Sequence, residues 1–333
     1  MQIKKLIQTK KKTKSILLIG GNIFNQDGPV IEFIKICKSK KIKLKLITDR
    51  EHLSYPVKNN FSFKKTLTKM NVKFKILDRL TLKDIDKICY DLDGPDTIIL
   101  SLNSIWFFNK LILKKYKNVF NYHNADLPTQ RGAGCHSWRI MMNSFLTSIN
   151  IHRLQSKIDQ GPIILNKKIK IPKYFINLQD YYDHIKKIEI DFFKKFLNEI
   201  NKKKFKSKKQ SNSKSFYFPW LKTKRNGYID WSWDTKHIIS FSHAFDKPFQ
   251  GISTFHKGKK INLKNAKFVD KKVNFHPFQY GLVYRKLANK IYIATKSGGI
   301  SFEYLSGFKH KIKLGDRLYT DIKSLYKARN LGR

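Results

Sequence analysis

Cysteine is rare in this sequence of 333 residues, which has only Cys37, Cys89 and Cys135. Three cysteines so far apart exclude a disulfide framework, and they do not have the spacing of zinc ligands. We therefore predict a chain without a metal site that works in a reducing compartment, the cytoplasm.

Long apolar runs are also missing. The first apolar run, Ser15–Gly20, follows a lysine-rich segment and is only six residues long. A secretory signal has a longer apolar core, and a membrane-spanning helix needs about 20 residues. The sequence therefore predicts no membrane insertion.

Acidic residues are few. The chain has 24 Asp and Glu and 69 Lys and Arg, which gives a formal charge of +45. A charge of this size raises the question of a nucleic-acid partner. Only ten of the basic residues are Arg, however, and Arg is the residue that makes paired hydrogen bonds to phosphate and guanine. Ile, Asn, Phe and Tyr are abundant while Ala, Gly and Pro are scarce. We attribute most of the lysine to an AT-rich coding bias, with a part left to attract anionic ligands.

The first half of the chain alternates short apolar runs with longer amphipathic ones. Runs rich in Ile, Val and Phe are typical of buried strands, and the stretches between them are typical of helices. This alternation predicts an α/β, Rossmann-like fold, which is a mostly parallel sheet with helices on both faces. The expected strands are 16–20, 43–48, 72–77, 97–102 and 119–123, and the expected helices are 29–38, 82–92 and 109–116.

The second half begins with a loop and a short helix at 136–143, followed by strands at 147–154 and 163–171 and a long helix at 178–200. The lysine- and serine-rich run 202–214 is predicted to be a linker. Beyond it, short alternating runs separated by turns predict a small, mainly β domain, a barrel of OB-like type or a sandwich. The runs lie at 251–255, 260–263, 280–284 and 290–294. The predicted organisation is an α/β catalytic domain at 1–201, a basic linker at 202–214 and a β domain at 215–333.

Three polar residues in the middle of the chain form the candidate catalytic site. Asn121 and His123 are two residues apart at the end of a predicted strand, so their side chains leave the same face. Ligand crevices of open α/β sheets form at such strand ends. Asp159 follows 36 residues after His123, in a turn between two strands, where a carboxylate can come close to the imidazole.

This set suits acyl transfer to an amine. Amide and imidazole N–H groups can stabilise the oxyanion of a tetrahedral intermediate, and a carboxylate can orient the imidazole and take a proton from the amine. The alternative interpretation is structural, with Asn121 as a turn residue, His123 as a core histidine and Asp159 as an Asx-turn residue before Gly161. Adjacent Cys135 and His136 point in different directions on a helix, which favours packing over a catalytic pair.

The surrounding pattern resembles the folate-dependent formyltransferases, which include glycinamide ribonucleotide, methionyl-tRNA and sugar-nucleotide N-formyltransferases. The resemblance lies in Asn121-Tyr-His123, Leu127-Pro128, Arg131-Gly132 and Asp159-Gln-Gly161, with the His-to-Asp spacing of the family. The match covers about residues 96–172, and Asn226–Trp231 and His243–Gly251 resemble the start of the family's C-terminal β domain. The resemblance implies that the enzyme is a formyltransferase and that Asn121, His123 and Asp159 are catalytic.

The resemblance also implies N10-formyltetrahydrofolate as the formyl donor. Its pterin is expected between the loop after strand 97–102 and the loop 155–161, although Trp106 and Phe107 are larger than the residues usual there. The expected donor-binding residues are Asn103, Ser104, Ile105, Trp106, Phe107, Gln155, Ile158 and Gly161. The acceptor is expected at Arg131, Gly132, Ala133 and Gly134, where Arg131 is suited to an anionic group.

Several acceptors remain open from the sequence. The stretch 131–139 and the segment 226–231 are more similar to sugar-nucleotide N-formyltransferases than to the tRNA enzyme, because the Ala-Pro continuation and the basic insertion usual in that enzyme are not evident. This favours a nucleotide-linked amino-deoxy sugar as acceptor, for the biosynthesis of surface glycans such as lipopolysaccharide. The alternatives are methionyl-tRNA formyltransferase, an RNA-binding protein with a degenerate site, and a formyl-folate hydrolase. By analogy, the resemblance is also consistent with a homodimer formed through the β domain.

Overall fold

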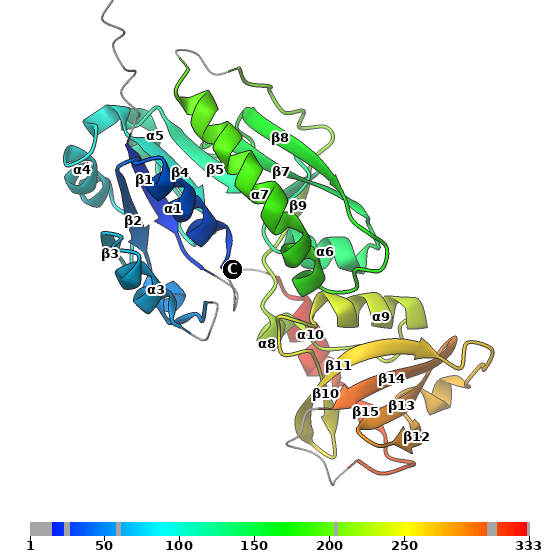
Figure 1. Cartoon of the computed structure of the whole chain (residues 1–333). Helices are drawn as coiled ribbons and strands as arrows, with labels where there is room; N and C mark the ends of the chain where they lie inside the picture. The colour runs from blue at the N-terminus through cyan, green and yellow to red at the C-terminus, as the bar shows by residue number, and fades with distance from the viewer. Residues whose placement is uncertain (1–14, 23–26, 58–60, 203–205, 305–311, 332–333) are drawn as a thin grey trace, which may run out of the picture. The chain divides into compact units, whose positions relative to one another are not determined.

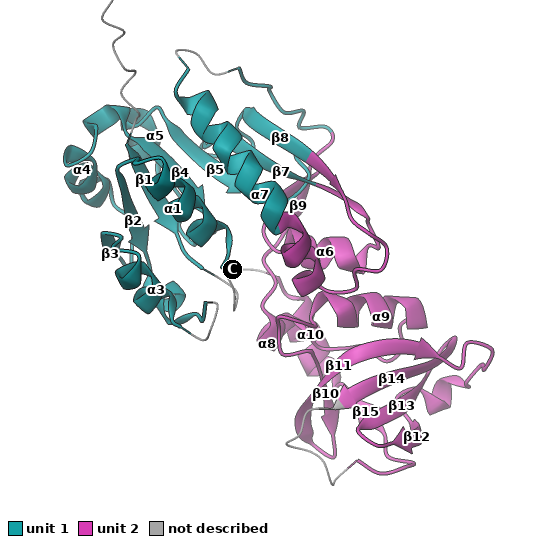
Figure 2. Cartoon of the chain, viewed as in Figure 1, with its two compact units in different colours: residues 1–128, 148–167, 186–213 teal, residues 129–147, 168–185, 214–333 magenta. Residues whose placement is uncertain are grey.

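The computed structural model describes residues 15–22, 27–57, 61–202, 206–304 and 312–331. The lysine-rich N-terminal segment and residues 203–205 of the expected linker lie outside the described residues. Figure 2 shows two compact units, of which the first comprises residues 1–128, 148–167 and 186–213 and the second residues 129–147, 168–185 and 214–333. The domain boundaries at 201 and 215 stay a prediction. Within the described ranges, no helix combines the length and the apolar character that crossing a membrane requires.

The first unit is built on a seven-stranded sheet with the order β3-β2-β1-β4-β5-β7-β8 (Figure 1). The strands from β1 to β5 are parallel, whereas β7 is antiparallel to β5. This order confirms the predicted mostly parallel, Rossmann-like sheet. The strands are β1 (Ile16–Gly20), β2 (Leu44–Thr48), β3 (Phe74–Ile76), β4 (Ile98–Leu102), β5 (Val119–His123), β7 (Leu146–Arg153) and β8 (Ile163–Lys170).

Helices cover both faces of this sheet. Leu17 and Val119 point to one face, where they share a buried cluster with Ile85 of α4 and Ile112 of α5. On the other face, Phe120 of β5 meets Phe196 of α7 edge to face, with ring centroids 5.6 Å apart. The helices are α1 (Pro29–Ser39), α2 (Arg50–Ser54), α3 (Phe63–Lys69), α4 (Leu82–Tyr90), α5 (Lys110–Lys115) and α7 (Leu178–Ile200), with a 3-10 turn η2 (Gly94–Asp96).

Local signals set the starts of these helices. Side chains of Ser62, Thr81 and Asn109 accept hydrogen bonds from backbone N–H groups in the first turns of α3, α4 and α5. Such caps stabilise a helix by about 1 kcal/mol each. The apolar stripe of α7 then fixes β5, because burying each large side chain contributes about 1.5–3 kcal/mol.

The second unit contains an antiparallel sheet of six strands in the order β12-β13-β14-β11-β10-β15. Backbone hydrogen bonds join its two edges, since Val283 N donates to Asp316 O and Leu318 N donates to Gly281 O, both at 2.8 Å. The sheet therefore curls into a small barrel, as the alternating runs predicted. Its strands are β10 (Ile252–His256), β11 (Lys259–Val269), β12 (Val283–Leu287), β13 (Lys290–Thr295), β14 (Gly298–Tyr304) and β15 (Leu318–Tyr319).

Helix α9 (Thr235–Ala244) packs on the barrel, where Ile238 joins a core that includes Trp231, Ile252 and Phe302. A two-stranded parallel sheet pairs β6 with β9, and α6 lies against α9. The remaining elements are β6 (Gln130–Gly132), α6 (Cys135–Met141), β9 (Phe216–Phe218), α8 (Thr223–Asn226), the 3-10 turn η3 (Pro277–Gln279) and α10 (Ile322–Arg329).

Two local expectations need correction. The strand predicted at 280–284 begins at Val283, because Pro277 starts the 3-10 turn η3 that takes up the preceding residues. In the segment predicted as a linker, residues 206–213 belong to the first unit, where Lys208 exchanges two backbone hydrogen bonds with Ile163 at 2.8 and 2.9 Å. This part of the segment is therefore held against the edge of the sheet.

Candidate active site

Asn121 and His123 are two of the last three residues of β5, the strand that pairs with β4 and β7. Their neighbours Phe120 and Tyr122 turn to the opposite face and pack on α7. The alternation of the strand therefore leaves the amide and the imidazole on the face that α7 does not cover. His123 is 7% exposed and Asn121 is half-buried.

The carboxylate of Asp159 lies beside both side chains. Its Oδ1 accepts a hydrogen bond from Asn121 Nδ2 at 3.4 Å, and its Oδ2 is 3.7 Å from His123 Nδ1. Asp159 is 8% exposed, so water screens these contacts only weakly. The structure thus brings together the three residues that the sequence singled out.

His152 is a fourth member of this cluster that the sequence did not indicate. It lies directly opposite Asn121 in the antiparallel register of β5 and β7, and its side chain is fully buried. Its Nε2 is 3.3 Å from Asp159 Oδ1 and 3.2 Å from Asn121 Nδ2, and its Nδ1 is 3.1 Å from the carbonyl of Arg153. With Nδ1 at the backbone carbonyl, Nε2 faces Asp159 and Asn121.

The loop that carries Asp159 is tightly held. Asp159 has a left-handed backbone with φ of 50°, a conformation that Asp tolerates better than most residues. Gln210 Nε2 donates to the carbonyls of Asp159 and Gly161 at 2.8 and 2.7 Å. A Cβ on Gly161 would lie 1.6 Å from the carbonyl oxygen of Arg153, so only glycine fits there. These contacts determine where the carboxylate points.

The expected donor-binding loops are partly available to a ligand. The backbone of Asn103 is left-handed and its Nδ2 donates to Gly21 O at 3.4 Å, while Ser104 Oγ accepts from Trp106 N at 3.1 Å. Trp106 itself packs on the cluster beneath α4 and α5 and donates from Nε1 to Asp78 O at 3.3 Å. The expected donor-binding residues with exposed side chains are Ile105, Phe107, Gln155 and Ile158.

The expected acceptor-binding residues belong to the second unit. Arg131 is 4% exposed and lies in β6, which pairs with β9. Gly132 has φ of 100°, and a Cβ there would lie 2.2 Å from Phe218 O. Ala133 N donates to the same oxygen at 2.8 Å, and Gly134 precedes the first residue of α6. The backbone of this loop is therefore fixed by pairing with β9.

Other candidate polar groups have structural partners. The buried Cys135 thiol donates to the carbonyl of Gln130 at 3.8 Å, and the ring of His136 packs on Tyr181 with centroids 4.4 Å apart. Asp126 Oδ1 accepts from Ser148 Oγ at 3.0 Å. In the part of the chain that the structure describes, no group of three or more His, Cys, Asp or Glu side chains is placed to hold a metal ion.

The comparisons with known proteins agree with the fold. Residues 222–313 match the family model of the formyl transferase C-terminal domain. Methionyl-tRNA formyltransferase of Rickettsia bellii is 28% identical over 187 residues, which is 56% of this chain and 60% of that protein. The bifunctional polymyxin resistance protein ArnA of Wigglesworthia glossinidia brevipalpis is 29% identical over 174 residues, which is 52% of this chain and 26% of that protein.

Among solved structures, the N-formyltransferase from Helicobacter canadensis in complex with folinic acid and dTDP-3-aminofucose has a TM-score of 0.64 and 17% identity. The alignment covers 87% of this chain and 99% of that one. This likeness establishes the fold. The chain spans 60% to 66% of the length of three methionyl-tRNA formyltransferases with which it aligns.

Proposed function

We propose, because the chain belongs to the folate-dependent formyltransferase family, that it moves a formyl group from N10-formyltetrahydrofolate to a primary amine. The observation that carries this proposal is the convergence of three groups at the end of β5, where the Asp159 carboxylate lies 3.4 Å from the Asn121 amide and 3.7 Å from the His123 imidazole. A carbonyl carbon placed among them meets two N–H donors and one proton acceptor.

The chemistry of each residue follows from its side chain. When the amine attacks the formyl carbon, negative charge develops on the formyl oxygen, and N–H donors on Asn121 and His123 stabilise that oxyanion. The attacking nitrogen loses a proton, which Asp159 accepts directly or through a water, and the folate nitrogen regains one as it leaves. His152 fixes the orientation of Asp159 and Asn121 by contacting both. Removing one oxyanion donor should lower kcat by about a hundredfold or more.

We further propose that the acceptor is the amine of a nucleotide-linked amino-deoxy sugar, in the cytoplasmic biosynthesis of a surface glycan. The sequence 131–139 supports this acceptor, as does Arg131, a residue type suited to a diphosphate. The N-formyltransferase of Helicobacter canadensis, solved in complex with dTDP-3-aminofucose, has the same fold. Methionyl-tRNA is the second candidate acceptor, because the methionyl-tRNA formyltransferase of Rickettsia bellii is among the relatives in sequence and the charge of +45 suits a polyanion.

The experiment is a transfer assay with N10-formyltetrahydrofolate and a panel of amino-sugar nucleotides and initiator methionyl-tRNA. We expect folate release, measured by absorbance, together with one added formyl group on a sugar nucleotide, measured by mass. Asp159→Asn should abolish both signals, and Asp191→Asn, a matched change of an exposed carboxylate on α7, should leave them unchanged. Full activity of Asp159→Asn would refute the proposed site.

The two acceptors differ in salt dependence. Binding of a tRNA through many phosphates weakens steeply as salt rises, whereas a sugar nucleotide has only a few charges to lose. We expect a shallow salt dependence of KM for the acceptor. Formylation of methionyl-tRNA alone, with a steep dependence, would establish the second candidate in place of the first.

A further inference from the structure

Arg139 of α6 is a buried cation that no carboxylate of the described residues balances. Its side chain is 4% exposed, its Nη1 donates to Ser144 O at 2.8 Å, and its guanidinium lies 5.1 Å from the centroid of the Tyr181 ring. Its Nε is buried without a hydrogen-bond partner, and among the described side chains none forms an ion pair with it. Burial lowers the pKa of this guanidinium because it disfavours the charged form. A buried charge without a partner is costly, so an anion bound here would stabilise the fold.

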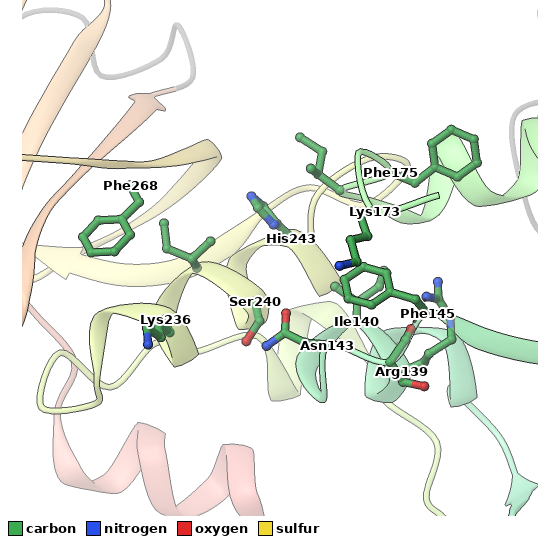
Figure 3. A pocket seen from close by; sticks show the side chains of 13 residues that line it. Arg139, Ile140, Asn143, Phe145, Lys173, Phe175, Lys236, Ser240, His243 and Phe268 are labelled. Carbon is green, nitrogen blue, oxygen red and sulfur yellow. Dashed lines mark hydrogen bonds between the residues drawn. The ribbon is translucent and has the colours of Figure 1, made fainter. Parts of the chain in front are cut away.

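A cavity of about 360 Å³ opens beside Arg139, within the range typical of small-molecule sites. It lies within the second unit, and its walls come from α6, α9, the segment 173–176 and β11. Figure 3 shows Arg139, Phe145 and Lys173 on one side of the cavity and Lys236 and Phe268 on the other. No residue of this lining belongs to the cluster around Asp159.

The charged side chains of the lining are cationic. Lys173 and Lys236 accompany Arg139, and the lining contains no carboxylate. The carboxylate of Asp180, close to the cavity along the chain, already accepts hydrogen bonds from the backbone N–H groups of Ile176 at 3.0 Å and Asn177 at 3.3 Å. Arg with lysines is the combination that recognises phosphate.

The rest of the lining is apolar and aromatic. Phe145, Phe175 and Phe268 are half-buried, so each presents part of its ring to the cavity, together with Ile140 and Ile239. Such rings hold a flat, weakly polar group by burial and by offset or edge contacts. A cavity of this composition matches a ligand that joins a phosphate to a planar base.

We propose that this cavity is a second ligand site, which binds a nucleoside phosphate. Arg139 holds the phosphate, with Lys173 and Lys236 adding to the attraction, and the phenylalanines bury the base. The site goes beyond the proposed transfer reaction, because the residues that form it are different and none of them takes part in the chemistry. Its occupancy supplies the anion that the buried guanidinium lacks.

Calorimetric titration of the full chain with UDP, ADP and inorganic diphosphate tests this proposal. We expect one nucleotide per chain to bind in this cavity, in addition to any that the proposed acceptor site holds, and we expect inorganic diphosphate to bind the cavity at least tenfold more weakly because it has no base. Lys173→Glu and Lys236→Glu change exposed residues and should each weaken nucleotide binding at least tenfold. Lys110→Glu, which reverses an exposed lysine at the start of α5, should leave it within twofold.

Two further variants separate this site from the proposed active site. Arg139→Gln should abolish nucleotide binding in this cavity, the binding that the two lysine reversals weaken, while the melting temperature is unchanged or raised, because the unpaired charge is gone. Asp159→Asn should bind nucleotide like the unaltered chain. The proposal is wrong if both lysine reversals leave the affinity within twofold, if inorganic diphosphate binds as tightly as the nucleotides, or if Asp159→Asn abolishes binding. If Arg139→Gln fails to fold, the two lysine reversals alone decide.

Discussion

Replacing Gln210 by alanine tests how the carboxylate of Asp159 is kept in place. The Gln210 amide donates to the carbonyls of Asp159 and Gly161 at 2.8 and 2.7 Å, so it spans the turn in which Asp159 has φ of 50°. The left-handed conformation costs about 1–2 kcal/mol for a residue with a Cβ. Two hydrogen bonds of about 0.5–1.5 kcal/mol each offset that cost. Without them, other conformations of the turn become comparable in free energy.

The expected loss can be estimated from these contacts. Removing about 1–3 kcal/mol corresponds to a factor of about 5 to about 150 in the equilibrium between the ordered turn and its alternatives. If Asp159 takes the proton from the amine, kcat of Gln210→Ala should fall by up to that factor. KM for the acceptor should change less, because Gln210 holds the turn and does not touch the reacting groups.

The assay is steady-state formyl transfer with saturating donor, together with hydrogen exchange of the backbone amides at 158–161. We expect faster exchange in this turn and a melting temperature within a few degrees of the original. The matched control is Ser211→Ala, since Ser211 is exposed and its Oγ pairs with the Oγ of the neighbouring Ser213. A kcat within twofold of the unaltered chain, with a folded variant, would refute the reasoning.

Three further predictions concern buried or paired groups. His152→Phe keeps a ring but loses the contacts to Asp159 and Asn121. The kcat should therefore fall about 10- to 100-fold, and the pH profile of kcat should shift. An unaltered pH profile would exclude a positioning role for His152. Burial raises the pKa of Glu189 to about 8, against the hydrogen bond from Tyr122, so the free energy of unfolding should decline as pH rises from about 4.5 to about 8. Glu189→Gln should remove this decline, by a few kcal/mol in denaturant titrations at pH 5 and pH 8. Burial alone would raise the pKa of Asp316, but the Lys313 backbone N–H, Lys257 and His256 lower it to about 2. This carboxylate therefore adds stability above about pH 4, and that stability is lost as pH falls to 2. The free energy of unfolding of Asp316→Asn, measured by acid titration, should fall over this range by up to about 2 kcal/mol less than that of the unaltered chain.

The sequence was most informative where one local pattern determined one element. The strands 16–20 and 119–123 and the helix 178–200 were predicted with the bounds that the structure has, because short Ile- and Val-rich runs and a long three- and four-residue periodicity leave little choice. Asn121 and His123 could be placed on one face for the same reason. The proximity of Asp159 was expected from its position in a turn between two strands, and the structure has it there.

The sequence was uninformative where a residue depends on pairing between distant segments. His152 lies near the end of β7 and reaches Asp159 only because β7 runs antiparallel to β5 in a register that places it opposite Asn121. Gln210 lies in a lysine- and serine-rich run with the composition of a linker, and nothing local indicates that it bonds to a turn 51 residues earlier. Arg139 is in an amphipathic helix in which a charged residue is expected to face water, yet it is buried.

Because each of the two units is discontinuous in sequence, truncating the chain or exchanging one unit affects the other. The polypeptide passes between the units after residues 128, 147, 167, 185 and 213, so each unit consists of three separate chain segments. A truncation near residue 201 would discard Gln210 and β9 while keeping the turn and the strand β6 that they hold. Such a fragment would retain Asn121, His123 and Asp159 but lack the backbone partners of two neighbouring loops. Attempts to swap the barrel between relatives should therefore exchange several stretches at once.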